Sequence, residues 1–221
     1  MLARAFLVLL FLACAIQPRC ASAAEPARVT PALVCAVQRA IRFHEPAWAE
    51  DRCERVAAAL SATPNPRQMA AICTNESDMR SGVVVKARPG VYDVGLCGVR
   101  CVCPKADYER WARGEMSGKE AADVTACRCQ NGPARGYSLA QMRDPAVNVR
   151  VAAAVLATKG GHLGRYNGAT TAKRGARYAA RIAAIEAAFG GRAVKVAARE
   201  TRLRKLVRQI VAAVRAAERK S

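Results

Sequence analysis

The sequence predicts a mainly α-helical, exported protein with a small extended or β lobe and several disulfides. Three observations lead to this fold class. Ala, Val, Leu, Arg and Glu recur at helical spacing through most of the 221 residues. A segment rich in Val, Gly and Cys interrupts that spacing between residues 83 and 103. The cysteines are numerous, and the N-terminus has the pattern of a secretion signal.

Residues 1–24 are expected to be a signal peptide. Arg4 precedes an apolar run from Ala5 to Ala13, and small residues follow from Ala21 to Ala24. The run is far shorter than the ~20 residues that span a bilayer. We therefore expect a mature chain that is secreted or periplasmic. The alternative is lipidation at Cys14, for which the preceding residues are a poor context.

The charge favours anionic partners. The formal net charge of +19 falls by two when Arg4 and Arg19 leave with the signal. For an exported protein such partners are cell-wall polymers and membrane surfaces. Aromatic residues make up only 5% of the chain, and no aromatic-basic platform for nucleic acid is visible. We expect a monomer that does not bind nucleic acid.

Eight of the ten cysteines remain after the signal. An even number in an exported chain indicates disulfides, although the pairing cannot be read from sequence alone. The alternative is a zinc site, because Cys-x-Cys occurs twice, but His44 and His162 lie far from those pairs. We expect no metal and no cofactor. The predicted disulfide cysteines are Cys35, Cys53, Cys73, Cys97, Cys101, Cys103, Cys127 and Cys129.

Residues 25–65 are predicted to form an N-terminal helical hairpin. Thr30 is a good N-cap before Pro31, and the first helix should run to Phe43. A second helix is expected from about Ala47 to Leu60. Cys35 and Cys53 would then face each other, so we predict a bond between them.

A third helix is predicted from Arg67 to about Asp78, and it carries the most informative residue of the chain. Met69, Ile72, Cys73 and Glu76 share one of its faces. Apolar neighbours disfavour a carboxylate and raise its pKa, which suits a general acid. The alternative is that Glu76 lies at a frayed helix end in water.

The middle of the chain is predicted to be extended. Short strands or loops are expected from Val83 to Cys103, with a turn at Pro89-Gly90. Residues 97–130 contain both Cys-x-Cys pairs and should form an insertion held by disulfides, as a loop or flap.

Helices are expected again from Asp144, a natural N-cap before Pro145. This helix should end at Lys159-Gly160-Gly161, and another should cover residues 172–189. Residues 190–221 should form a basic amphipathic helix that can lie on an anionic membrane or wall polymer. The alternative is that it packs on the domain with its basic face in water. The predicted apolar stripe of the helix after Asp144 is Val147, Val151, Val155 and Leu156.

Five fragments, in order, resemble motifs of the soluble lytic transglycosylase family, within the lysozyme-like superfamily. Ile72–Ser77 resembles the Glu-Ser end of the catalytic helix, and Tyr92–Leu96 resembles the start of the following Gly-Leu-Met-Gln segment. The other three are Asp144–Asn148, similar to Asp-Pro-x-x-Asn; Arg165–Gly168, similar to Ala-Tyr-Asn-Gly; and Tyr178–Ile182, similar to the start of the last core helix.

The resemblance implies a lysozyme-like α+β domain over residues 66–189 and an enzyme that cleaves peptidoglycan. Glu76 would protonate the β-1,4 linkage between MurNAc and GlcNAc and then assist attack by the muramyl 6-hydroxyl, leaving a 1,6-anhydro product. It also implies further roles: substrate holding or Glu76 orientation by Ser77, cleft lining by Gly95 and Leu96, positioning of Glu76 and the sugar by Tyr166 and Asn167, and support from below by Tyr178.

Two alternatives follow from the same residues. Ordinary glycosidases need a second carboxylate. Asp78 would turn away on its helix, and Asp93 is expected in a tight turn beside Gly95. If Asp93 faces the cleft, a goose-type muramidase that hydrolyses the bond becomes the alternative. In addition, Cys97-Gly98 replaces the Met-Gln of the family. Loss of that sugar-contacting Gln would suit a non-catalytic, cationic peptidoglycan-binding protein.

Overall fold

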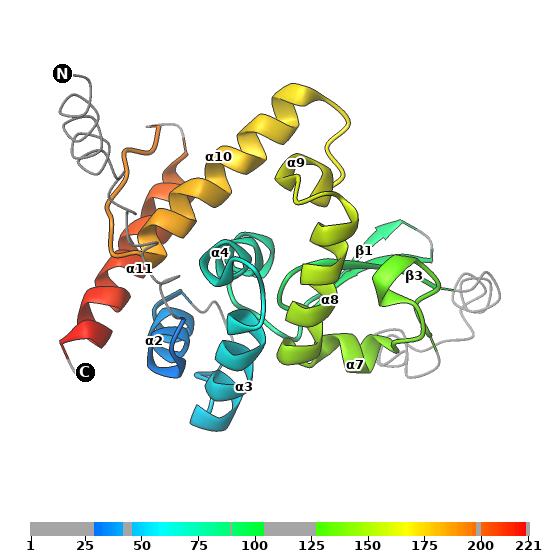
Figure 1. The fold of residues 1–221 in the computed structure, drawn as a ribbon, viewed down its shortest axis with the longest axis horizontal. Helices are drawn as coiled ribbons and strands as arrows, with labels where there is room; N and C mark the ends of the chain where they lie inside the picture. Colours follow the sequence, from blue (N-terminus) through cyan, green and yellow to red (C-terminus); the bar gives the residue numbers. More distant parts are fainter. Residues whose placement is uncertain (1–28, 42–45, 89, 104–126, 198–199, 220–221) are drawn as a thin grey trace, which may run out of the picture.

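The computed structural model describes residues 29–41, 46–88, 90–103, 127–197 and 200–219. The predicted signal peptide and the centre of the predicted insertion lie outside these residues. Within them, the chain is mainly helical and carries a small three-stranded antiparallel sheet in the order β1-β2-β3 (Figure 1). The predicted combination of helices, a small β lobe and disulfides is therefore confirmed.

The elements follow one another as a run of helices, the sheet, and a second run of helices. They are α2 (Pro31–Ile41), α3 (Glu50–Ser61), α4 (Pro66–Ser77), β1 (Val84–Arg88), β2 (Val91–Val94), β3 (Val99–Val102), the 3₁₀ turn η2 (Gly132–Ala134), α7 (Leu139–Arg143), α8 (Pro145–Thr158), α9 (Leu163–Tyr166), α10 (Ala172–Phe189) and α11 (Thr201–Glu218). None of these described helices is long and apolar enough to cross a bilayer.

Side-chain caps fix several helix starts. The Thr30 hydroxyl accepts from the backbone N–H of Leu33 (3.2 Å), and the Asp144 carboxylate accepts from that of Val147 (2.8 Å). Both predicted starts are confirmed. Each cap satisfies a backbone donor that the first helical turn leaves unpaired, which makes the start readable from sequence.

The predicted start of the second helix at Ala47 is wrong by three residues, since α3 begins at Glu50. Buried Gln38 of α2 explains the difference. Its side chain donates to the carbonyl of Pro46 (3.1 Å) and accepts from the N–H of Trp48 (3.1 Å). These hydrogen bonds to α2 keep the segment from Pro46 to Trp48 out of α3.

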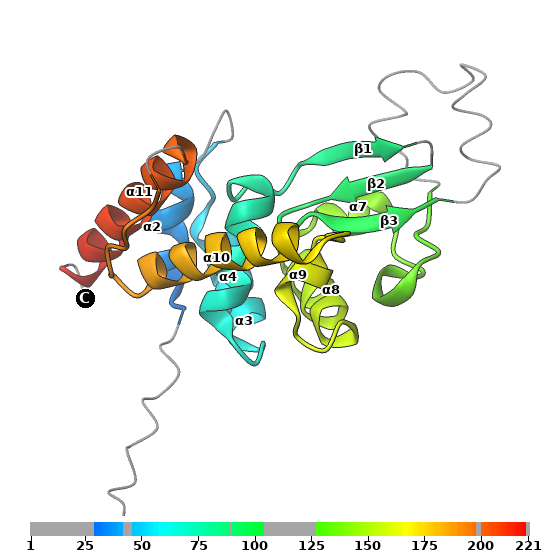
Figure 2. The same ribbon diagram turned by 90° about the horizontal axis from the view of Figure 1, so that it is seen from above.

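Helix α4 lies near the centre of the molecule. Long α10 packs along it and also contacts α9 and α11, while α3 packs on α8 (Figure 2). The sheet lies at one end of the molecule, and α2 and α11 lie side by side at the other. Met69, Ile72 and Cys73 of α4 are buried as predicted.

Helix α8 turns a different face inward from the one predicted. Val151 is buried, but Val147, Val155 and Leu156 are only half-buried. The centre of the buried face is Asn148, which is fully buried. Its amide can enter the core because three backbone groups satisfy it there. Periodicity that counts only apolar residues therefore misplaced the face.

Helix α11 is amphipathic as predicted, and its apolar stripe packs on the domain. This helix packs on α2 and α10, and Gln209 donates to the carbonyl of Ala40 (3.0 Å). The buried residues of the stripe are Leu203, Leu206, Val207, Ile210, Val211 and Val214. The arginines Arg202, Arg208 and Arg215 are exposed. The packing alternative therefore describes this helix in the structure.

The eight predicted disulfide cysteines form four bonds. The Cys35–Cys53 bond confirms the predicted pairing. Cys73 bonds Cys97, and the two Cys-x-Cys pairs bond each other as Cys101–Cys129 and Cys103–Cys127. Several disulfides are compatible with a secreted protein.

Candidate active site

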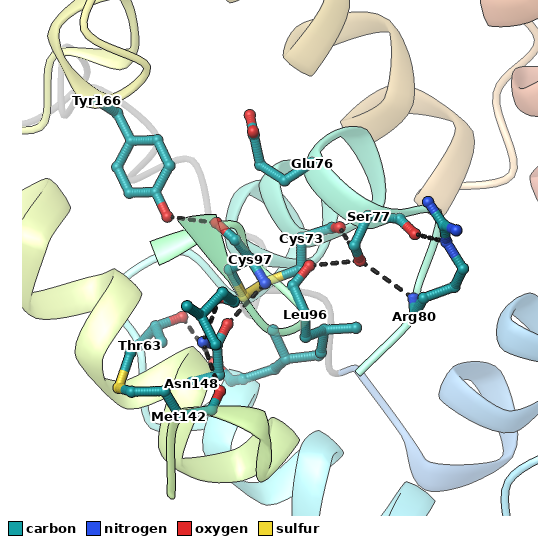
Figure 3. Close-up of a disulfide and its surroundings, with 12 residues drawn as sticks. Thr63, Cys73, Glu76, Ser77, Arg80, Leu96, Cys97, Met142, Asn148 and Tyr166 are labelled. Carbon is teal, nitrogen blue, oxygen red and sulfur yellow. Dashed lines mark hydrogen bonds between the residues drawn. A yellow bond between two sulfur atoms is a disulfide. The ribbon is translucent and has the colours of Figure 1, made fainter. Parts of the chain in front are cut away.

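Glu76 lies in the last turn of α4, and its carboxyl points away from the Cys73–Cys97 disulfide (Figure 3). The helix ends at the next residue, Ser77, and Asp78 after it takes a left-handed conformation with φ 53°. The Tyr178 hydroxyl of α10 donates to Glu76 Oε1 at 2.7 Å. The Asn75 amide donates to the same oxygen at 3.3 Å. Glu76 is therefore a held, half-buried group and not a frayed side chain in water.

The surroundings raise the pKa of Glu76. The main cause is burial, which disfavours the charged carboxylate. The hydrogen bonds from Tyr178 and Asn75 oppose this rise, as does the charge of Arg181, while the charge of Asp93 adds to it. A carboxyl with a raised pKa stays protonated to higher pH and can donate its proton to a substrate oxygen.

The two tyrosines of the predicted site have different partners. Tyr178 touches Glu76 directly, whereas the Tyr166 hydroxyl donates to the carbonyl of Cys97 at 2.8 Å (Figure 3). Burial raises the pKa of both phenols. Both hydroxyls therefore keep their protons at neutral pH and remain donors. Tyr178 donates to Glu76 itself, and Tyr166 donates to the Cys97 carbonyl.

The loop from Gly95 to Gly98 is held by buried polar contacts. Asn148 accepts from the N–H of Cys97 (2.7 Å) and donates to the carbonyls of Val94 and Met142 (both 2.9 Å). Gly95 has φ +74°, and a Cβ there would come within 2.4 Å of the Asn148 amide. A side chain larger than hydrogen does not fit, so this glycine and this asparagine depend on each other.

Ser77 joins the same loop to α4. Its hydroxyl donates to the carbonyl of Leu96 at 2.6 Å and accepts from the N–H of Arg80 at 3.1 Å (Figure 3). Ser77 is 1% exposed and Leu96 is fully buried. The pair therefore connects two parts of the fold behind the site.

Gly98 supports Glu76 by having no side chain. Its φ is +60°, and a Cβ there would lie 3.0 Å from Glu76 Cβ and 3.2 Å from Glu76 Oε2. The neighbouring Cys97 is bonded to Cys73, one turn before Glu76 on α4. The Cys97-Gly98 pair thus holds the loop against the helix and leaves room for the acid.

Glu76 opens into a cleft of about 480 Å³ between the sheet, η2, and the ends of α8 and α9. Four predicted site residues line it: Glu76, Asp93, Tyr166 and Asn167. The prediction that Gly95 and Leu96 line the cleft is wrong, because they lie under its surface with Ser77. Gly98, Val99 and Arg100 supply that side instead. Tyr178 does not line the cleft and reaches Glu76 from α10 through its hydroxyl.

Asp93 does not lie in a tight turn as predicted. It lies within β2, directly opposite Arg100 on β3. The guanidinium donates to both carboxylate oxygens, at 2.8 and 3.0 Å. Asp78 turns away as predicted, and it pairs with Arg202 of α11. Among the described residues, the cleft therefore holds one carboxyl without a cationic partner, Glu76, and one bound to an arginine.

Three cleft cations were not predicted: Arg100, Lys159 and Arg165. Their positions depend on cross-strand pairing and on how α8 and α9 end, which no local pattern shows. Asn148 was also missed as a positioning residue, although it lies in the Asp-Pro-x-x-Asn fragment. Its polar side chain on an otherwise buried helix face was the available signal.

The described residues offer one close group of metal-ligand atoms, the sulfurs of Cys101, Cys103 and Cys127. Each of them is in a disulfide. Because a metal binds the free thiolate, these sulfurs are not ligands in this state.

Comparison with protein-family models, with the sequences of curated proteins and with solved structures finds no match. The function is therefore inferred from the residues and geometry of the site.

Proposed function

We propose that this protein is an exported, lysozyme-like lytic transglycosylase that cleaves peptidoglycan. The observation that carries the proposal is Glu76, a half-buried carboxyl with a raised pKa at the edge of a cleft. The cleft volume of about 480 Å³ lies within the range of small-molecule sites. The order of the five motif-like fragments supports the same family. Each contributes a residue to the cleft, to Glu76 or to the loop beside it: Glu76, Asp93, Asn148, Tyr166 and Tyr178.

In the proposed reaction, protonated Glu76 gives its proton to the glycosidic oxygen between MurNAc and GlcNAc. The bond from the muramyl anomeric carbon to that oxygen breaks, and GlcNAc leaves as an alcohol. The muramyl 6-hydroxyl attacks the same carbon and returns its proton to Glu76. Tyr178 stabilises the carboxylate during the intervening step, because its hydroxyl already donates to Oε1. No water is consumed.

Hydrolysis of the goose type is the second candidate, because Asp93 does line the cleft with Glu76. A base on the far side of the sugar could activate water. However, both Asp93 oxygens already accept hydrogen bonds from the Arg100 guanidinium, so the carboxylate is occupied by the sheet and is poorly placed to bind a water. The geometry therefore favours transglycosylation.

Mass spectrometry of digested peptidoglycan separates the candidates. We expect 1,6-anhydro-muramyl products, and products with a reducing-end MurNAc would overturn transglycosylation. Glu76→Gln should lower the rate by about 10²- to 10⁴-fold, the range that general acids contribute. Asp93→Asn serves as the matched variant, because it should retain product formation in a transglycosylase and lose it in a hydrolase.

The same assay tests the non-catalytic alternative. A binding protein would release no soluble glycan, and Glu76→Gln would bind insoluble peptidoglycan as well as the wild type does. A wild type that releases no product would remove the enzymatic proposal.

A further inference from the structure

We propose that a second cavity beside the cleft binds the peptide stem of the muramyl residue, and that Arg165 binds a carboxylate of that stem. The inference rests on the proposed function, because it names the part of peptidoglycan that this site would recognise. Arg165 lines both cavities and so connects the two.

The charges of the cleft call for an anionic group on the substrate. Arg100 is neutralised by Asp93. Lys159 and Arg165 are exposed and have no ion-pair partner among the described residues. When Glu76 is protonated, two positive charges therefore remain uncompensated around the cleft. A neutral sugar chain would not require them, whereas a carboxylate would be held strongly by an arginine.

The second cavity has room for a short peptide. Its volume is about 520 Å³, and it lies over α9 and the first half of α10. Gln68, His162, Thr170 and Thr171 supply polar groups, and the rest of its surface is largely Gly and Ala. Small residues leave space for an extended backbone, and the polar side chains can bind its amides.

Two glycines keep this cavity in shape. A Cβ on Gly164 of α9 would lie 2.8 Å from the Cα of Gly175 of α10. The two helices can therefore approach closely only without side chains at this crossing. Close packing there fixes the backbone of α9 next to Arg165, whose side chain lies between the cleft and the second cavity.

The test compares two glycan substrates. One retains its stem peptides, and the other has been stripped by an amidase, which removes the peptide and leaves the lactyl carboxylate of MurNAc. Wild-type protein should cleave the stem-bearing strands faster. Arg165→Gln should lower the ratio of the two rates about tenfold, as expected for loss of one charge-assisted contact. Ala176→Phe, at an exposed position of the second cavity, should lower the same ratio by filling the space.

Arg208→Gln, on the exposed face of α11, removes the same charge elsewhere and should leave the ratio unchanged. If Arg165→Gln slows both substrates equally, Arg165 acts on a group that the two substrates share, such as the lactyl or sugar part of MurNAc, and the inference fails. An unchanged ratio in both cavity variants would also overturn it. If wild-type protein cleaves neither substrate, the proposed function itself fails, which is a different result.

Discussion

At Glu76, the raised pKa that suits a general acid also lowers the stability of the fold at high pH. Its folded-state pKa is raised by burial, so the unfolded chain releases the proton at lower pH than the folded chain does. The stability linked to this proton is fully present below the unfolded pKa, about 4.3, and is lost as pH rises through the folded pKa. Glu76→Gln cannot ionise and should avoid that loss.

Thermal unfolding of wild-type protein and Glu76→Gln at pH 4 and at pH 8 checks this. We expect the thermal midpoint of Glu76→Gln, relative to that of the wild type, to be higher at pH 8 than at pH 4. A difference that moves in favour of Glu would contradict the assignment of Glu76 as a desolvated acid.

Tyr178→Phe tests the hydrogen bond that opposes the pKa rise. Without the phenol the charged carboxylate loses a donor, so the pKa of Glu76 should rise further. The high-pH limb of the activity profile should therefore shift to higher pH. Tyr166→Phe is the matched control. This variant removes the hydrogen bond to the Cys97 carbonyl, so it should lower the free energy of unfolding by about 1 kcal/mol. The high-pH limb of the activity profile should stay in place.

Gly98→Ala tests the space beside the acid. The new Cβ would meet Glu76, and the positive φ adds strain of about 1 kcal/mol. Gly136→Ala is the control, since Gly136 has φ +86° and no atom lies within 4 Å of the place that a Cβ would take there. Both variants should unfold at lower temperature. Glycan cleavage should fall only in Gly98→Ala, and equal activity in the two variants would contradict the support role.

At the residue scale, the sequence predicted the position of Glu76 and its contact with Tyr178, but not the contacts of Asn148 and Gly98. Helical spacing put Glu76 beside Met69, Ile72 and Cys73, and the resemblance of Ile72–Ser77 to a family motif singled it out. The places of Gly95 and Leu96 could not be predicted, because a motif shows which residues are near a site but not whether they lie on its surface or beneath it. In the sequence, Gly98 marked the loss of the Gln that contacts sugar in the family. In the structure, its positive φ and its closeness to Glu76 give it a supporting role.

The Cys73–Cys97 disulfide connects α4 to the turn between β2 and β3. We compare its removal, by C73A/C97A, with removal of the remote Cys35–Cys53 bond by C35A/C53A. The bonds span 24 and 18 residues, so each should contribute about 3 kcal/mol by chain entropy. Activity at a temperature where both variants are folded should fall mainly in C73A/C97A. Equal activity losses would show that the bond stabilises the fold without positioning the site.

Helix boundaries were predictable where a local cap sets them, as at Thr30 and Asp144. They were not predictable where another element decides. The start of α3 depends on Gln38 of α2, and the buried face of α8 depends on Asn148 and its carbonyl partners. In both cases the deciding hydrogen bonds are made by a buried polar side chain, which a pattern of apolar residues does not count.

At the scale of the whole molecule, α11 completes the core. Deletion of residues 200–221 would expose apolar residues of α2 and α10. We expect the shortened chain to lose its cooperative thermal transition, measured by circular dichroism. A truncated chain that melts cooperatively at the wild-type temperature would contradict this.

Deletion of α11 is therefore a poor test of binding to anionic surfaces. Neutralising the exposed Arg208 and Arg215 is the cleaner change.

The contact between α2 and α11 also determines when folding can finish. Gln209 and Ala40, which are hydrogen-bonded, lie 169 positions apart. Such long-range pairing forms slowly, because a large loop must close before the contact is made. During synthesis, the part of the α2 surface that α11 covers therefore stays exposed until α11 has been made, although α3 can already pack on the rest.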